Sequence, residues 1–183
     1  MLRIINSLLA AACVLLLLFH ALWAAALLFG LTGYSPFISR VGWVFLACLT
    51  LHGLLSFYLF LIHDRPAPRF PYPRSNAAAW VQRISGAAMV LFIIPHLNEA
   101  YGHVTMSGWF LPHEPTVGRY LLEAGLLVSV VAHLWVSLPR LPLSLGLLRD
   151  EGSFRRWQKG LRLGLALTGL TVLMALSKYF LLG

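Results

Sequence analysis

INSLLAAACVLLLLFHALWAAALLFGL, residues 5–31, is an apolar run without an acidic residue, lysine, arginine or proline. A bilayer core about 30 Å thick needs about 20 apolar residues in a helix, so this run is long enough to span it. Four further apolar runs follow, and each must be helical because lipid offers no partner to unpaired backbone groups. The sequence predicts an all-α integral membrane bundle of five transmembrane helices, at about residues 5–31, 41–63, 77–98, 118–139 and 160–182.

The composition agrees with this class. Hydrophobic residues make up 59% of the 183 residues, against about 45–50% in soluble domains, and the mean hydropathy is +0.78. We expect residues 1–183 to form a single transmembrane domain. The first run resembles a signal peptide, but it is longer than the apolar core of one, so we expect it to be a retained helix.

The distribution of positive charge along the chain predicts the membrane topology. A net charge of +8 would suggest nucleic-acid binding in a soluble protein, but here most of the basic residues flank two loops, between the second and third spans and between the fourth and fifth. These residues are Arg65, Arg69, Arg74, Arg83, Arg140, Arg149, Arg155, Arg156, Lys159 and Arg162. Basic loops favour the cytoplasmic side. We therefore expect a cytoplasmic N-terminus, an outside C-terminus, a location in the inner (cytoplasmic) membrane, and lipid rather than nucleic acid around the chain.

The first four spans carry histidines near their middle or one end, at His20, His52, His96 and His133. An ionisable ring at membrane depth is costly, and such a residue is a functional hypothesis by default. Their depths pair His20 with His96 towards the outer side and His52 with His133 towards the inner side, at levels roughly 10–15 Å apart. The pairs predict two bis-histidine haem irons, and the alternative is that each ring only hydrogen-bonds a neighbouring helix.

The haem type and one competing ligand also follow from the sequence. No Cys-x-x-Cys-His motif is present, so covalent attachment is excluded and any haem is b-type. His63 competes with His52 as the inner ligand. The two residues are eleven positions apart, which is almost three helical turns, so both rings lie on one face about 16 Å apart. We assign the inner iron to His52 and keep His63 as a haem propionate or quinone contact.

A motif in the third span is more specific. Trp80-Val81-Gln82-Arg83-Ile84-Ser85-Gly86 is followed by His96, ten residues after the glycine. This string resembles the third helix of the di-haem cytochrome b subunits of succinate dehydrogenases and fumarate reductases. The resemblance covers the first four spans, through His20 with Gly30, His52-Gly53, and Ala132-His133-Leu134.

The resemblance implies a membrane-anchoring subunit of a succinate:quinone oxidoreductase that carries electrons between an iron–sulfur subunit and a membrane quinone. FAD and the iron–sulfur clusters would reside on a flavoprotein and an iron–sulfur subunit docked on the cytoplasmic face, where the dicarboxylate chemistry would take place. The implied quinone is menaquinone in preference to ubiquinone. The chain departs from some fumarate reductases, which carry a glutamate two residues before the fourth ligand, because Val131 stands there.

Polar residues near the two haem levels are candidates for supporting roles. Gln82, Arg83 and Ser85 begin the third span near the inner boundary and could bind a haem propionate or quinone, since guanidinium matches carboxylate bidentately. Glu123 and Glu99 are candidates for proton handling at an outer quinone site, because a carboxylate inside a span is expensive unless it is protonated or paired.

Ring nitrogens that do not bind a metal need hydrogen-bond acceptors. Ser56 and Ser129 each stand four residues from a proposed ligand and are candidate acceptors, although serines inside helices usually bond their own backbone.

Three other functions remain open from the sequence: a di-haem anchor of another respiratory dehydrogenase or reductase, a haem-free membrane anchor, and a small transporter. Nitrate reductase anchors draw their ligands from two helices, whereas the histidines here are spread over four. The transporter hypothesis lacks interrupted helices in matching halves.

Overall fold

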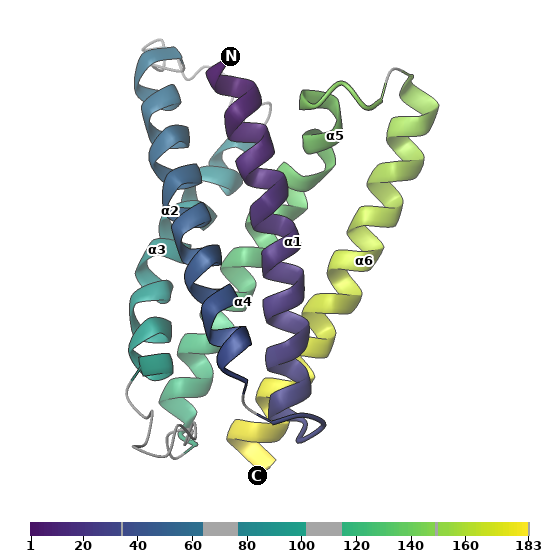
Figure 1. Ribbon diagram of the computed structural model, residues 1–183. Coiled ribbons are helices and arrows are strands. Elements are labelled where there is room, and N and C mark those ends of the chain that lie inside the picture. Colours follow the sequence, from purple (N-terminus) through teal and green to yellow (C-terminus); the bar gives the residue numbers. More distant parts are fainter. Residues whose placement is uncertain (34, 64–76, 102–114, 149, 183) are drawn as a thin grey trace.

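The computed structural model describes residues 1–33, 35–63, 77–101, 115–148 and 150–182 (Figure 1). This part of the chain contains helices and no strand. The five long helices are α1 (Leu2–Leu28), α2 (Pro36–His63), α3 (Ala77–Tyr101), α4 (Val117–Ser137) and α6 (Glu151–Ser177). Two short elements, η1 (Leu138–Arg140) and α5 (Leu141–Ser144), lead from α4 towards α6, and the π-helix η2 (Lys178–Leu182) extends α6.

All five long helices are long and apolar enough to cross a membrane, which confirms the predicted all-α class and the number of candidate spans. Their large apolar side chains are mostly turned outwards, as at Leu15 and Leu91, which are 70% and 71% exposed. In water such a surface would be a costly apolar patch, whereas lipid accepts it. The outside of this bundle therefore fits a hydrocarbon solvent.

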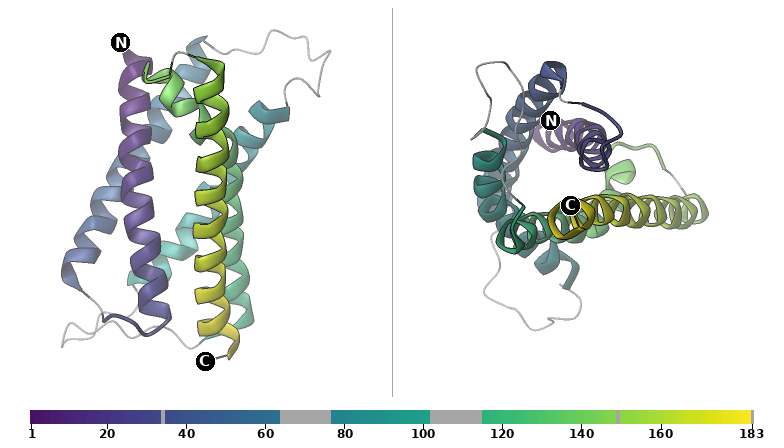
Figure 2. Two further views of the ribbon diagram at one scale, coloured as in Figure 1. Left: turned by 90° about the vertical axis from the view of Figure 1, so that its right-hand side faces the viewer. Right: turned by 90° about the horizontal axis from the view of Figure 1, so that it is seen from below.

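Consecutive long helices run in opposite directions (Figure 1). The N-terminus, α5 and the start of α6 consequently lie at one end of the bundle, and the C-terminus lies at the other (Figures 1 and 2). We call these the N-terminal end and the C-terminal end. Helices α2 and α4, after which the two basic loops predicted to share one side of the membrane follow in the sequence, both end at the N-terminal end.

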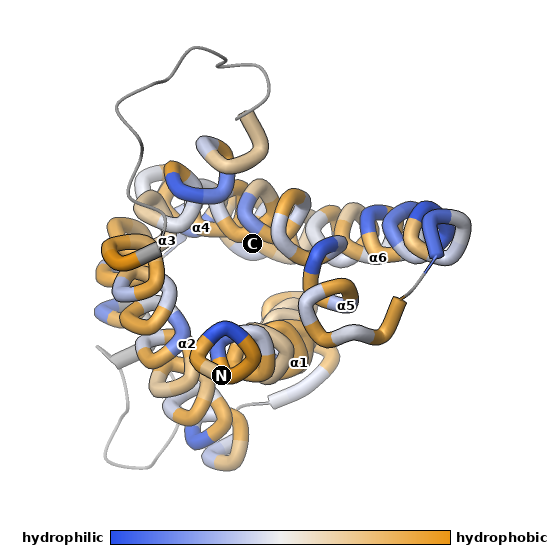
Figure 3. Tube along the Cα trace, turned by 90° about the horizontal axis from the view of Figure 1, so that it is seen from above, coloured by the Kyte–Doolittle hydropathy of each residue, from blue (hydrophilic) through white to orange (hydrophobic). Residues whose placement is uncertain are grey.

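The helices associate as two hairpins with α6 beside them. Helix α1 packs along α2 and α3 packs along α4, while α6 contacts both α1 and α4. Seen down the bundle, the long helices surround a central region (Figure 3). The four candidate histidines come from α1, α2, α3 and α4, so each hairpin supplies two of them.

The ends of the helices are fixed by polar contacts. The side chains of Thr116 and Asp150 accept hydrogen bonds from backbone amides in the first turns of α4 and α6, respectively. Such N-caps satisfy amides that have no partner inside the helix. At the C-terminal end, Lys178 Nζ donates to the carbonyl of Phe29 at 2.9 Å and thereby ties the end of α6 to the end of α1.

The predicted start of the fifth helix, at about residue 160, is wrong. Helix α6 begins at Glu151, because the Asp150 carboxylate accepts from the amide of Ser153 at 2.7 Å and Glu151 pairs with Arg155 one turn later. The hydropathy pattern marks only the apolar part of a helix, whereas capping and ion pairing extend the helix beyond it.

Helix α3 packs tightly against α4 at Gly125. A Cβ atom on this glycine would lie 2.7 Å from Cζ of Phe92 on α3. Real Cβ atoms do not come that close, so only glycine lets the phenylalanine ring rest on the α4 backbone. This contact lies between the two histidine levels and holds together the hairpin that carries His96 and His133.

We expect Gly125→Val to destabilise the α3–α4 hairpin, because the added atoms overlap the Phe92 ring. Overpacking of this kind costs about 1–3 kcal/mol, and it should lower the midpoint of thermal unfolding of the detergent-purified protein. Gly164→Val is the matched control, since nothing lies within 4 Å of a Cβ atom at that position. Equal midpoints for the two variants would show that the contact does not limit stability.

Candidate functional site

The outer histidine pair meets in the structure. The ring centroids of His20 on α1 and His96 on α3 lie 6.2 Å apart, and the ring planes are almost perpendicular at 84°. The two rings thus meet edge to face, and they come from different hairpins. The predicted pairing of His20 with His96, made from depth alone, agrees with this placement.

The separation of these two rings fits a shared metal ion. An imidazole nitrogen binds a metal at about 2.0 Å, and bonds of about 1.33 Å put a five-membered ring's centroid about 1.13 Å behind that nitrogen. Two imidazoles on opposite sides of one iron would therefore have centroids about 6.3 Å apart. The 6.2 Å between His20 and His96 matches this value.

Glu123 of α4 anchors the ring of His96. Its two carboxylate oxygens lie 3.0 and 3.1 Å from Nδ1 of His96. The side chain of Glu123 is 16% exposed and that of His96 is 32% exposed. A carboxylate accepts the Nδ1 proton and fixes the tautomer in which Nε2 carries the lone pair. Because Nδ1 is engaged by Glu123, a metal bond of His96 would form through Nε2.

The inner pair is anchored in a similar way. Nδ1 of His133 on α4 donates to the backbone carbonyl of Gln82 on α3 at 3.0 Å, and the hydroxyl of Ser85 lies 3.5 Å from the same nitrogen. The ring packs against α3 at Gly86, where a Cβ atom would lie in ordinary van der Waals contact with Nδ1, at 3.5 Å. His52 on α2 is within electrostatic range of His133. The Trp-to-Gly string that begins the third span thus surrounds one of the predicted ligands.

The other ring of each pair lies on the α1–α2 hairpin, and that of His52 is near the backbone of Asn6 on α1. Nδ1 of His20 and Nδ1 of His52 are buried and have no hydrogen-bond partner. Leaving a polar atom buried without a partner costs about 1–3 kcal/mol. His96 and His133 thus have anchored Nδ1 atoms within the α3–α4 hairpin, whereas His20 and His52 on the α1–α2 hairpin each keep a buried Nδ1 atom without a partner.

The two pairs occupy different levels along α3. His133 touches α3 at Gln82 and Gly86, whereas the outer pair includes His96, ten residues beyond Gly86. Ten helical residues rise about 15 Å. This distance is enough to stack two macrocycles one above the other across a bilayer core of about 30 Å.

A search of the described residues finds no group of three or more histidine, cysteine or acidic side chains that could hold a metal ion. Haem iron needs only two protein ligands, because the macrocycle supplies the other four.

Other predicted site residues are placed differently. The guanidinium of Arg83 lies over the ring of Phe60 on α2, 4.7 Å from its centroid, so the structure gives it an aromatic partner. Ser85 directs its hydroxyl to the carbonyls of Val81 and Gln82 as well as towards His133. Whether Gln82, Arg83 and Ser85 contact a propionate or quinone stays a prediction.

The serines proposed as acceptors for the histidines are not the acceptors. Ser56 exchanges hydrogen bonds with the side chain of Asn6 on α1 at 3.1 and 3.2 Å, and Ser129 donates to the carbonyl of Gly125 in its own helix at 2.8 Å. The observed acceptors are Glu123 and the carbonyl of Gln82. Glu123 was expected to handle protons, and the residue types alone gave no sign of its contact with His96.

Two predicted residues cannot be compared at the level of their side chains. His63 is the last residue of α2 and Glu99 lies near the end of α3, but both side chains lie outside the described residues. Their assigned roles, His63 at a propionate or quinone and Glu99 in proton handling, stay predictions. A feature absent from the prediction is Pro95, which lies inside α3 directly before His96 and removes one amide donor from the helix.

Comparison with known proteins leaves the site to be interpreted from its own geometry. No protein-family model, no curated protein and no solved structure matches this chain.

Proposed function

We propose that this chain is a di-haem cytochrome b that anchors a succinate:quinone oxidoreductase in the membrane. The observation that carries the proposal is the approach of His20 on α1 to His96 on α3, and four histidines from four spans would supply the ligands of two irons at two levels. His20 and His96 form the outer pair and His52 and His133 the inner pair. The 6.2 Å between the outer rings supports a single iron between them.

Bound b-type haem supplies one-electron redox chemistry, and two histidine ligands close both axial positions, which favours electron transfer over oxygen chemistry. The chain's own contribution is to orient the imidazoles. Glu123 and the carbonyl of Gln82 hold the Nδ1 atoms of His96 and His133, so that Nε2 would be the atom of each ring that binds a metal. These contacts also raise the basicity of the rings.

The partners in this proposal are an iron–sulfur subunit and an FAD-containing flavoprotein, bound at the N-terminal end of the bundle on the cytoplasmic side of the inner membrane. The basic loops at that end support this orientation. A membrane quinone, menaquinone in preference to ubiquinone, would exchange electrons near the outer pair, where Glu123 lies. The dicarboxylate chemistry would take place on the flavoprotein.

A visible spectrum of the detergent-purified protein tests the proposal directly. We expect a reduced-minus-oxidised spectrum of low-spin b-type haem and two haems per chain in a pyridine haemochrome assay. A transporter or a haem-free anchor would give no such spectrum, and that result would overturn the redox function. Reduction of both haems by succinate in membranes would then identify the electron donor.

Docking of the soluble subunits should depend on the basic loop between α2 and α3. Reversing Arg65, Arg69 and Arg74 together to glutamate should release these subunits at moderate salt, because exposed ion pairs are screened. Co-purification on a tag attached to the membrane subunit measures the release. Arg40→Glu is the control, since Arg40 lies at the C-terminal end; loss of the subunits in this control as well would show a general effect of charge.

A further inference from the structure

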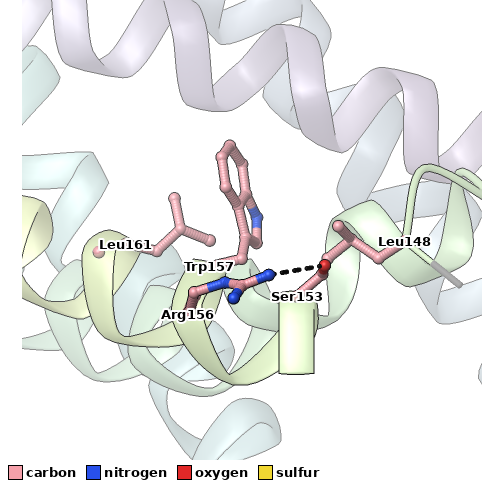
Figure 4. Close-up of a pocket in the computed structure, with 6 residues that line it drawn as sticks. Leu148, Ser153, Arg156, Trp157 and Leu161 are labelled. Atoms are coloured by element: carbon pink, nitrogen blue, oxygen red, sulfur yellow. Dashed lines mark hydrogen bonds between the residues drawn. The ribbon is translucent and has the colours of Figure 1, made fainter. Parts of the chain in front are cut away.

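A pocket lies beside the first turns of α6, at the N-terminal end of the bundle and away from the histidines (Figure 4). Its volume is about 420 Å³, within the range of about 300–1,000 Å³ of small-molecule sites. It is lined by Leu148, Ser153, Arg156, Trp157, Gly160 and Leu161. The first half of α6 stands away from the rest of the bundle, with α5 beside it (Figures 1 and 3), so this pocket is open to the surroundings of the helix.

The pocket combines one cation with an apolar wall. The lining residues of α6 follow the spacing of a single helix face, and Trp157 and Leu161 form its apolar side (Figure 4). Nη2 of Arg156 approaches the hydroxyl of Ser153 at 3.4 Å, a long and weak hydrogen bond. Within the described part of the chain, Arg156 forms no ion pair. Neighbouring Arg155, by contrast, is paired with Glu151 at 2.7 Å.

The position of the pocket relative to the apolar part of α6 points to the membrane surface. Immediately beyond it, α6 turns exposed leucines outwards, among them Leu163 and Leu167, which are 62% and 57% exposed. Tryptophan is enriched at the level of the headgroups, and Trp157 is 48% exposed. The pocket therefore lies where a headgroup meets the acyl chains.

We propose that this pocket binds the phosphate headgroup of an anionic phospholipid, with the guanidinium of Arg156 on the phosphate and the acyl chains against Trp157 and Leu161. Guanidinium is suited to phosphate through its fork of donors, and basic pockets beside transmembrane helices are typical sites for such headgroups. Lys159 and Arg162 add positive field on the same helix. The proposal does not depend on haem or on the redox function.

Native mass spectrometry of the protein purified with added cardiolipin or phosphatidylglycerol tests the site. We expect one tightly retained anionic lipid, and we expect Arg156→Gln to weaken its binding about fivefold, the effect of removing one cationic side chain near the membrane surface. Gly160→Leu should also displace the lipid, because a Cβ atom at Gly160 meets nothing within 4 Å and the leucine would fill the pocket.

Matched controls separate the pocket from the general charge and bulk of the helix. Arg155→Gln removes an arginine outside the pocket, and Gly164→Leu adds the same bulk one turn further along, where nothing lies within 4 Å of a Cβ atom. Both should retain the lipid as the unmodified protein does. Equal loss in these controls, or equal retention of zwitterionic phosphatidylethanolamine, would overturn the proposal.

Two further measurements distinguish a lipid in the pocket from a free anion or a protein partner. Inorganic phosphate at the same concentration should not compete; if it displaced the lipid headgroup or bound alone as tightly, the pocket would be a site for a free anion. If Arg156→Gln released the soluble subunits and left lipid retention unchanged, the arginine would serve a protein partner and the lipid assignment would be wrong.

Discussion

His20→Ala should leave the protein with one b-type haem in place of two. The outer iron would keep His96 alone, and a five-coordinate iron held by one imidazole is bound weakly and loses its low-spin spectrum. The inner pair is anchored separately, by the bond from His133 to the carbonyl of Gln82, so its haem should persist. A pyridine haemochrome assay would fall by half, and a redox titration would lose one of two components.

His52→Ala supplies the comparison that tests the assignment to levels. It should remove the component that His20→Ala retains, because the two histidines belong to different pairs. His113→Ala, at a histidine outside the predicted spans, should keep both haems. Loss of the same component in both ligand variants would refute the pairing. If His52→Ala kept two low-spin haems and His63→Ala lost one, the inner ligand would be His63.

The sequence was sufficient for the class of fold and for bringing His20 close to His96. Five apolar runs demand five spans in lipid, and the alternating direction of the spans converts position along the chain into depth. Depth alone then brings His20 to the level of His96. In the structure these two rings lie 6.2 Å apart. Their proximity therefore required no information beyond the positions of the spans.

The contacts that hold the rings could not be predicted in this way. Which side chain of α4 meets His96 depends on the rotation and spacing of two helices, and the close approach at Gly125 sets both. The acceptor for His133 is a backbone carbonyl, a group that every residue carries and that no sequence pattern distinguishes. Serine was the wrong candidate because its hydroxyl finds a carbonyl in its own helix first, as at Ser129.

Glu123→Ala should raise the midpoint potential of the outer haem and leave that of the inner haem unchanged. The carboxylate lies within 3.1 Å of Nδ1 of His96 through both oxygens. A negative acceptor behind a ligand increases its basicity and favours the oxidised iron. Removing it favours the reduced form, and each tenfold change in this preference corresponds to about 59 mV for one electron. We expect a rise of tens of millivolts, measured by redox-titrated spectroscopy.

Glu123→Gln separates the two roles that the residue could have. The amide oxygen of the glutamine can still accept a hydrogen bond from Nδ1 of His96 but carries no charge. If Glu123 acts through His96, Glu123→Gln should raise the midpoint potential of the outer haem less than Glu123→Ala does. If Glu123 only handles quinone protons, Glu123→Gln should lower quinone-linked turnover and leave both midpoint potentials and the succinate-to-dye activity intact. The geometry favours the first outcome, because a carboxylate engaged with a ring nitrogen through both oxygens cannot lose its charge without changing the field at that ligand.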